Sequence, residues 1–178
     1  AKKDAALLKM ADAIEAHEAE ILAANEKDLQ AARESGMRKS MLDRLALTSA
    51  RIAGMAQGVR EVAAQEDPIG QVVSGFVRPN GLQIQRVRVP LGVIGIIYEA
   101  RPNVTADAAA LCLKAGNAVI LRGGKEAIHS NTAVAEAMRQ AVEEAGLPAD
   151  CIQLVQDTTR ASSIEMMGLT DYLDVLIP

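Results

Sequence analysis

The chain has 178 residues, of which 49% are hydrophobic and 24% are charged, and its formal net charge is −4. This composition is typical of one globular domain or slightly more, and it excludes a disordered chain. Only 2% of the residues are aromatic and none is Trp. Few side chains can therefore stack on the bases of single-stranded nucleic acid, and the net negative charge argues against binding to a phosphate backbone.

The cysteines and histidines are too few and too scattered for a disulfide framework or a metal site. Cys112 and Cys151 are far apart in sequence, and His17 and His129 are expected to lie on helix surfaces. No apolar run approaches the length of a membrane span, and the charged first residues do not resemble a signal peptide. We therefore expect a cytoplasmic protein without a bound metal.

Residues 1–67 are predicted to form helices, because apolar side chains recur there every three or four residues. The apolar positions are Leu7, Ala11, Ile14, Ile21 and Leu22 in the first helical pattern, and Ile52, Met55, Val59 and Val62 in the second. Thr48 or Ser49 can cap the second pattern, and Asp67-Pro68 ends the helical segment.

Residues 68–90 are predicted to form a hairpin arm. Two runs rich in β-formers, 71–77 and 82–89, flank the turn sequence Arg78-Pro79-Asn80-Gly81. In the second run the apolar positions change parity, which predicts a β-bulge or a change of environment near Gln85 and Arg86 unless this strand is misjudged. An isolated two-stranded ribbon is marginally stable, so we expect the arm to project from the core and to pair with other protein.

From residue 91 onward, short strands that are apolar on both faces alternate with helices. The predicted strands are 92–98, 117–121, 152–155 and 172–177, and the predicted helices are 104–115, 127–145 and 158–167. This alternation is typical of an α/β fold with a doubly wound parallel sheet covered on both sides. The chain ends just as the last strand finishes, where ligand-binding loops usually follow, so we expect a fragment of a longer protein.

The first candidate site follows the strand 92–98, which brings Glu99, Arg101 and Asn103 to its carboxyl end. Arg101 can hold a phosphate or a carboxylate through two hydrogen bonds, or it can form a surface ion pair with Glu99. Asn103 can donate its amide N–H to a developing oxyanion, or it can cap the helix that follows. Thr105 is the alternative cap.

The second candidate site is the turn formed by Arg122, Gly123, Gly124 and Lys125, which joins a strand to a helix. Glycines allow a ligand to approach the backbone, and the two cations favour a phosphate. The turn has the spacing of neither the P-loop nor the dinucleotide fingerprint, so an ordinary strand–helix turn is the alternative. Cys112 is expected to be a buried structural thiol, and Cys151 has no basic partner in sequence.

The longest motifs carry a resemblance to a known family. Residues 90–105 read PLGVIGIIYEARPNVT and residues 116–126 read GNAVILRGGKE; residues 41–47 and 174–178 agree with the same pattern. Across nearly its whole length the chain resembles the gamma-glutamyl phosphate reductase family, a branch of the aldehyde dehydrogenase superfamily. The resemblance implies helices, a hairpin arm of the oligomerisation type at 68–90, and most of a cofactor domain at 91–178, without the catalytic domain.

The resemblance also implies a reaction. It is the NADPH-dependent reduction of L-glutamyl 5-phosphate to L-glutamate 5-semialdehyde in proline biosynthesis, through a thioacyl intermediate on a catalytic cysteine. Neither cysteine of this chain lies in a matching motif, so the chain alone is expected to be inactive.

The resemblance assigns residues to the cofactor and the substrate. Cofactor contacts fall on Ile97, Tyr98 and Glu99 and on the turn Arg122, Gly123, Gly124 and Lys125, where two cations suit NADPH better than NADH. Aligned from the strand, the oxyanion asparagine of the superfamily falls on Arg101, which can instead hold the acyl phosphate; counted from Gly116-Asn117, it falls nearer Glu99. Asn103 is the nearest asparagine.

The expected partners are L-glutamyl 5-phosphate, further copies of the chain and glutamate 5-kinase, which can also be fused to the reductase. The alternative is a non-catalytic nucleotide-binding or assembly module that shares only the fold.

Overall fold

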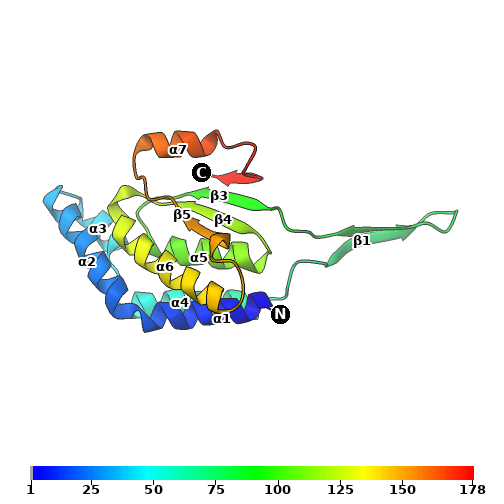
Figure 1. Cartoon of the computed structure of the whole chain (residues 1–178), viewed down its shortest axis with the longest axis horizontal. Helices are drawn as coiled ribbons and strands as arrows, with labels where there is room; N and C mark the ends of the chain where they lie inside the picture. The colour runs from blue at the N-terminus through cyan, green and yellow to red at the C-terminus, as the bar shows by residue number, and fades with distance from the viewer. Residues whose placement is uncertain (1) are drawn as a thin grey trace.

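The computed structural model describes residues 2–178 and has two parts of unequal burial, a packed body and a projecting arm (Figure 1). Four helices come first: α1 (Lys2–Ala16), α2 (Glu18–Glu34), α3 (Lys39–Leu45) and α4 (Ser49–Ala64). The predicted apolar positions of α1, α2 and α4 are buried, or half-buried at Leu22 and Val62. The Oγ1 atom of Thr48 accepts a hydrogen bond from the backbone N–H of Arg51, which confirms Thr48 as the cap of α4.

The arm is a two-stranded antiparallel hairpin formed by β1 (Val72–Val77) and β2 (Gln83–Val87). Gly81 adopts φ +84° in the turn and donates its N–H to the carbonyl of Arg78 at 2.9 Å. Every residue of both strands is exposed, so the arm has no cover among residues 2–178.

The hairpin has an irregular register, but the extra residue lies on the first strand. Val72 pairs with Val87 and Ser74 pairs with Arg86, so Val73 is the additional residue. The prediction of a bulge near Gln85 and Arg86 on the second strand is wrong in its place, because the additional residue lies on the first strand, opposite Arg86 and Val87. Every residue of β2 is exposed in residues 2–178, and the alternative of a change of environment near Gln85 and Arg86 stays a prediction.

The body contains the predicted four-stranded parallel sheet, and its strand order is β5-β4-β3-β6. The strands are β3 (Val93–Ile97), β4 (Ala118–Arg122), β5 (Ile152–Leu154) and β6 (Val175–Ile177). The connections are α5 (Pro102–Lys114), α6 (Ile128–Glu144) preceded by the turn η1 (Lys125–Ala127), the turn η2 (Ala149–Cys151), and α7 (Arg160–Met167). The chain winds outward from β3 to β5 and then crosses back to β6, which is the doubly wound arrangement.

The two faces of the sheet are covered differently. Helices α5 and α6 pack on one face, with α1 and α4 behind them, and one continuous apolar core joins these elements (Figure 1). Helix α7 lies on the other face. A side chain at Gly95 would come within 2.7 Å of Met166 Cε, so glycine allows α7 to approach β3 closely. No helix of residues 2–178 is long and apolar enough to cross a membrane.

Helix α5 begins earlier than predicted. Pro102 is its first residue and Arg101 stands at the N-cap position, without a side-chain capping bond. Asn103 is therefore inside the helix, and the interpretation of Asn103 as the cap is wrong. Thr105 is not the cap either: it is buried, and its hydroxyl lies 2.7 Å from the hydroxyl of Tyr98 and donates to Asn131 Oδ1 at 3.0 Å.

Candidate functional site

Three neighbouring cavities lie at and beside the carboxyl ends of β3 and β4, where parallel sheets usually bind ligands. The helix cavity, of about 520 Å³, is lined by Asp43, Arg44, Ala46, Leu47, Arg51, Gly54, Met55, Arg101, Asn103 and Asp107. The strand-end cavity, of about 450 Å³, is lined by Met41, Arg44, Tyr98, Glu99, Ala100, Arg101, Arg122, Gly124 and Glu126. The turn cavity, of about 430 Å³, is lined by Arg122, Gly124, Lys125, Glu126, Thr158, Thr159, Arg160 and Ser163.

The cavities form a row because neighbours share wall residues. Arg44 and Arg101 line both the helix cavity and the strand-end cavity. Arg122, Gly124 and Glu126 line both the strand-end cavity and the turn cavity. The strand-end cavity therefore brings together most of the predicted site residues, whereas Asn103 lines only the helix cavity and Lys125 only the turn cavity.

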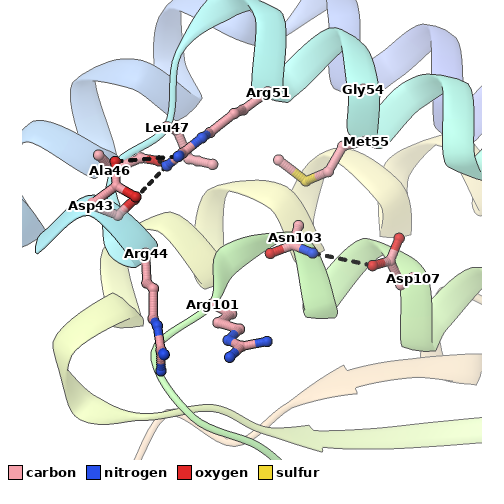
Figure 2. A pocket seen from close by; sticks show the side chains of 10 residues that line it. All are labelled: Asp43, Arg44, Ala46, Leu47, Arg51, Gly54, Met55, Arg101, Asn103 and Asp107. Atoms are coloured by element: carbon pink, nitrogen blue, oxygen red, sulfur yellow. Dashed lines mark hydrogen bonds and ion pairs between the residues drawn. The ribbon is translucent and has the colours of Figure 1, made fainter. Parts of the chain in front are cut away.

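Arg101 and Arg44 are the two cations at the junction of the helix and strand-end cavities. Their guanidinium groups extend in the same direction, from the start of α5 and from α3 (Figure 2). Both side chains are exposed, and neither has a hydrogen-bond or ion-pair partner among residues 2–178. The surface ion pair between Arg101 and Glu99 is therefore not formed in this part of the chain. Two unpaired guanidinium groups at one junction are suited to a multiply charged anion.

Sequence reasoning missed Arg44, because α3 is far from α5 in sequence and only the fold brings the two arginines to one cavity wall. A signal was available: Arg44 lies within the segment 41–47 that contributed to the family resemblance. Arg51, in contrast, is engaged. Its guanidinium donates to the backbone carbonyls of Asp43 and Ala46 and lies 3.4 Å from Asp43 Oδ1.

A buried polar network fixes the connection between α3 and α4 beside Arg44. Asn25 donates to the carbonyl of Leu45 at 2.9 Å and accepts from the N–H of Leu47 at 2.8 Å. Asn25 also donates to Ser130 Oγ at 3.0 Å, and Ser130 donates from both its N–H and its hydroxyl to Asp28. Asp28 thus receives the first N–H groups of α6, which positions this helix start against α2 and α3.

Asn103 points into the helix cavity rather than toward the strand ends (Figure 2). Its amide nitrogen Nδ2 donates to Asp107 Oδ2 at 3.3 Å, one helical turn further along α5. Partial burial raises the pKa of the Asp107 carboxyl above its ordinary value, and the amide of Asn103 offsets part of this rise.

Tyr98 fills the space between β3 and the turn that follows β4. Its backbone N–H donates to the carbonyl of Arg122 at 3.0 Å, which extends the pairing of Ile97 with Arg122 beyond the end of β3. Burial raises the pKa of the Tyr98 hydroxyl to about 12, so this group is neutral. The nearby Asn131 Nδ2 is buried without a hydrogen-bond partner among residues 2–178.

The cations around the turn cavity differ in their engagement. The Nη2 atom of Arg122 donates to the carbonyls of Thr158 at 2.8 Å and Thr159 at 2.9 Å, just before α7. Lys125 and Arg160 have no hydrogen-bond or ion-pair partner among residues 2–178. The cations available to a ligand in this cavity are therefore Lys125 and Arg160, and sequence reasoning missed the second.

The two glycines of the turn are explained by packing within the chain. A side chain at Gly123 would lie 2.2 Å from Asn131 Nδ2, and one at Gly124 would lie 3.2 Å from the backbone nitrogen of Ala100. A residue with a Cβ would therefore push the turn away from β3 and α6. The approach of a ligand to the same backbone stays a prediction.

The two cysteines have the surroundings of structural thiols. Cys112 is buried in α5, and burial raises the pKa of its thiol to about 11. Cys151 is half-buried, and burial also raises its pKa. Neither is a thiolate near neutral pH, as a nucleophile would need to be. Residues 2–178 contain no group of three His, Cys, Asp or Glu side chains that could hold a metal ion.

Comparison with known proteins identifies the family. The profile of the aldehyde dehydrogenase family matches residues 1–171. The chain belongs to this family. It is 57% identical over 176 residues to the gamma-glutamyl phosphate reductase of Xanthomonas campestris and 55% identical to that of Syntrophomonas wolfei. These matches cover 99% of the chain but only 42% of each relative, so the chain spans less than half their length.

Solved structures of aldehyde dehydrogenase relatives agree with the fold. The crystal structure of gamma-glutamyl phosphate reductase from Thermotoga maritima superposes with a TM-score of 0.97 at 44% identity, over 99% of the chain and 43% of that structure. The reductase from Saccharomyces cerevisiae gives 0.90 at 35% identity, over 99% of the chain and 45% of that structure. The predicted resemblance and the predicted fold class are confirmed.

Proposed function

We propose that the protein carrying this chain reduces L-glutamyl 5-phosphate to L-glutamate 5-semialdehyde and releases inorganic phosphate, with NADPH as reductant. The observation that carries the proposal is the pair of unpartnered guanidinium groups of Arg44 and Arg101, between the helix cavity and the strand-end cavity. The similarity to proteins named gamma-glutamyl phosphate reductase supports the same substrate.

In this proposal the two arginines bind the phosphate of the substrate. A guanidinium group forms two parallel hydrogen bonds to phosphate oxygens, and two such groups offset the charge that the departing phosphate carries. Arg101 is better placed than Asn103 to face the reacting carbonyl, because the Asn103 amide is directed at Asp107. We therefore assign oxyanion stabilisation to Arg101 and leave Asn103 a role deeper in the helix cavity.

The turn cavity is proposed to hold the adenosine end of the cofactor. The residues present fit an anionic nucleotide, because Lys125 and Arg160 are unpartnered cations on its wall and Asn131 offers an unused buried donor nearby. Gly124 lines both the turn cavity and the strand-end cavity, and Tyr98 and Glu99 line the strand-end cavity, whereas Ile97 and Gly123 line neither. When bound, NADPH supplies the hydride that reduces the acyl group.

The nucleophilic thiolate is proposed to lie outside the matched part of the relatives. Cys112 and Cys151 are neutral thiols, and neither lines the helix, strand-end or turn cavity. We therefore propose that residues 1–178 alone lack activity. We also propose that they comprise a helical segment at 1–67, the arm at 68–90 and part of a cofactor domain at 91–178.

The arm is proposed to join copies of the protein. It exposes large apolar side chains on both faces of the ribbon, and no residue of the described chain covers them: Val72, Val73, Phe76, Val77, Leu82, Ile84 and Val87. Exposed apolar ribbons with open edges pair readily with other chains. A cytoplasmic location and glutamate 5-kinase as the partner that forms the acyl phosphate complete the proposal.

The test uses the product of the complete reading frame that encodes this chain. In the reverse direction, glutamate 5-semialdehyde, phosphate and NADP⁺ should yield NADPH, followed by its absorbance, and the rate should require phosphate. Cys112→Ser and Cys151→Ser should retain most of the turnover, whereas residues 1–178 alone should show none. Oxidation that needs no phosphate, or loss of turnover by several orders of magnitude in a folded cysteine variant, contradicts the proposal.

A further inference from the structure

The helix cavity has charged and polar side chains from α3, α4 and α5 on its wall, together with the apolar side chains of Leu47 and Met55. One end, at the junction with the strand-end cavity, has the guanidinium groups of Arg44 and Arg101. The other end has Asn103 and Asp107 on α5 below helix α4 (Figure 2). A ligand that spans this cavity therefore meets cations at one end and a carboxylate at the other.

The carboxylate of Asp107 is available to a cation. No Lys, Arg or His nitrogen among residues 2–178 lies within 4.0 Å of it, and its one hydrogen bond is the long contact from Asn103 Nδ2. The other carboxylate on the cavity wall, Asp43, is already beside the guanidinium of Arg51. Asp107 is an exposed residue in this part of the chain, and desolvation by the neighbouring atoms raises the pKa of its carboxyl.

Helix α4 leaves room above Asp107. Gly54 lines the cavity, and a side chain there would meet no atom within 4 Å. Gly58, one turn further along the same helix, would place a side-chain carbon 3.7 Å from Asp107 Oδ1. Glycine inside a helix is destabilising relative to alanine, so two glycines on the face above a cavity indicate a requirement for space.

We propose that Asp107, together with the amide oxygen of Asn103, binds the protonated α-amino group of the glutamyl substrate. The assignment rests on the proposed function, because that function places the phosphate at Arg44 and Arg101. Arg101, at the N-cap of α5, and Asp107 both line the helix cavity, so one ligand in this cavity can reach both charges. Leu47 and Met55 on the same wall offer apolar contacts to the methylene groups of a glutamyl chain.

The hydrogen-bonding capacity of the pair suits an ammonium group. Asn103 uses its Nδ2 group on Asp107, so its amide oxygen remains an acceptor, and an ionised Asp107 is an acceptor only. Acceptors that lose their water without gaining a donor are costly, so the site should discriminate against an analogue that lacks the amino group. Asp107 is thus a specificity-determining residue rather than one that acts on the reacting carbonyl.

The experiment compares two substrates on the same enzyme samples, prepared from the complete reading frame. The apparent kcat/KM is measured in the reverse direction for glutamate 5-semialdehyde and for 5-oxopentanoate, which has the same chain without the amino group. Asp107→Asn should lower the value for the amino substrate by about tenfold to a hundredfold and change that for 5-oxopentanoate by less than about threefold. The ratio of the two kcat/KM values does not depend on partial unfolding, because both substrates are measured with the same fraction of active enzyme.

Asp43→Asn is the matched control, since it removes a carboxylate from the same cavity that already has a cationic partner. The ratio between the two substrates should be unchanged in this variant. A ratio that is also unchanged in Asp107→Asn overturns the assignment while the proposed function stands. A wild-type enzyme that turns over neither substrate with phosphate and NADP⁺ overturns both.

Discussion

Arg101 and Arg122 lie at the carboxyl ends of two neighbouring parallel strands, yet their side chains have opposite surroundings. At the end of β3, Arg101 is exposed at the junction of two cavities and has no partner among residues 2–178. At the end of β4, Arg122 is half-buried and donates to the carbonyls of Thr158 and Thr159. A basic residue at a strand end is therefore not by itself a ligand for an anion. A guanidinium group is engaged where the fold supplies backbone carbonyls to it, and it remains available to a ligand where the fold supplies no partner.

The largest expected effect concerns Arg44 and Arg101, whose guanidinium groups have no partner among residues 2–178. In the complete protein, Arg44→Ala and Arg101→Ala should each lower kcat/KM with the acyl phosphate by about tenfold to a hundredfold, since a hydrogen bond to a charged group contributes roughly 1.5–3 kcal/mol. The double variant should lose more than either single variant, although the two effects need not add. Steady-state kinetics with the acyl phosphate measure these changes.

Arg33→Ala is the control for this pair, because Arg33 lies on the exposed surface in an ion pair with Glu26. Exposed pairs of this kind contribute little, so its kinetics should match the wild type. If the double Arg44/Arg101 variant also matches the wild type, the junction does not bind the substrate.

The second-largest expected effect concerns cofactor binding, where the unpartnered Lys125 is compared with the engaged Arg122. Lys125→Ala should weaken NADPH binding by about tenfold to a hundredfold and leave NADH binding nearly unchanged, because only NADPH carries a 2′-phosphate. Arg122→Met should change the ratio between the cofactors little, since its guanidinium already serves two carbonyls. Titration of both cofactors at low and high salt measures the ratio and its screening.

An equal loss of NADPH and NADH affinity in Lys125→Ala contradicts the assignment of the turn to the 2′-phosphate. A selective loss of NADPH affinity in Arg122→Met shows instead that Arg122 leaves its carbonyl partners for the ligand, which breaks the distinction between an engaged and an available arginine.

The sequence predicted the architecture well because the relevant signals are local. Buried strands such as 92–98 and the spacing of Leu7, Ala11 and Ile14 depend on neighbours along the chain, and these elements are confirmed. The predicted start of α5 was too late in the sequence, because Pro102 can occupy the first helical turn, where its missing N–H costs nothing. Asn103 therefore lies inside the helix.

The site was harder to predict because its features depend on contacts between distant segments. The place of Arg44 on the cavity wall depends on contacts among α2, the end of α3 and α6, which are joined through Asn25, Asp28 and Ser130. The engagement of Arg122 depends on the loop before α7, far along the chain. Residue type and spacing identify a charged side chain, but they do not show which carbonyl or cavity it will face.

A smaller effect should mark Arg122 as a structural residue. Arg122→Met removes the donors to the carbonyls of Thr158 and Thr159, which should destabilise the loop before α7 by about 1 kcal/mol after allowance for partial exposure. Hydrogen exchange should therefore accelerate in residues 157–162 and remain unchanged in α1. The corresponding substitution of the unpartnered Lys125 should leave this exchange unchanged, and equal protection in Arg122→Met contradicts the structural role.

The smallest expected effect is a gain in stability that is accompanied by weaker substrate binding. Gly54 lies inside α4 with no atom within 4 Å of a built side-chain carbon, so alanine fits there without strain. Gly54→Ala should raise the free energy of unfolding by about 1 kcal/mol, because alanine favours the helix, and should raise KM several-fold because the methyl group enters the helix cavity. Ala53→Gly, at the exposed neighbouring position outside that cavity, should lower stability by a similar amount without changing KM. Denaturant unfolding and kinetics on both variants separate these effects. An unchanged KM in Gly54→Ala would place the substrate elsewhere along the row of cavities, on the side of the strand ends.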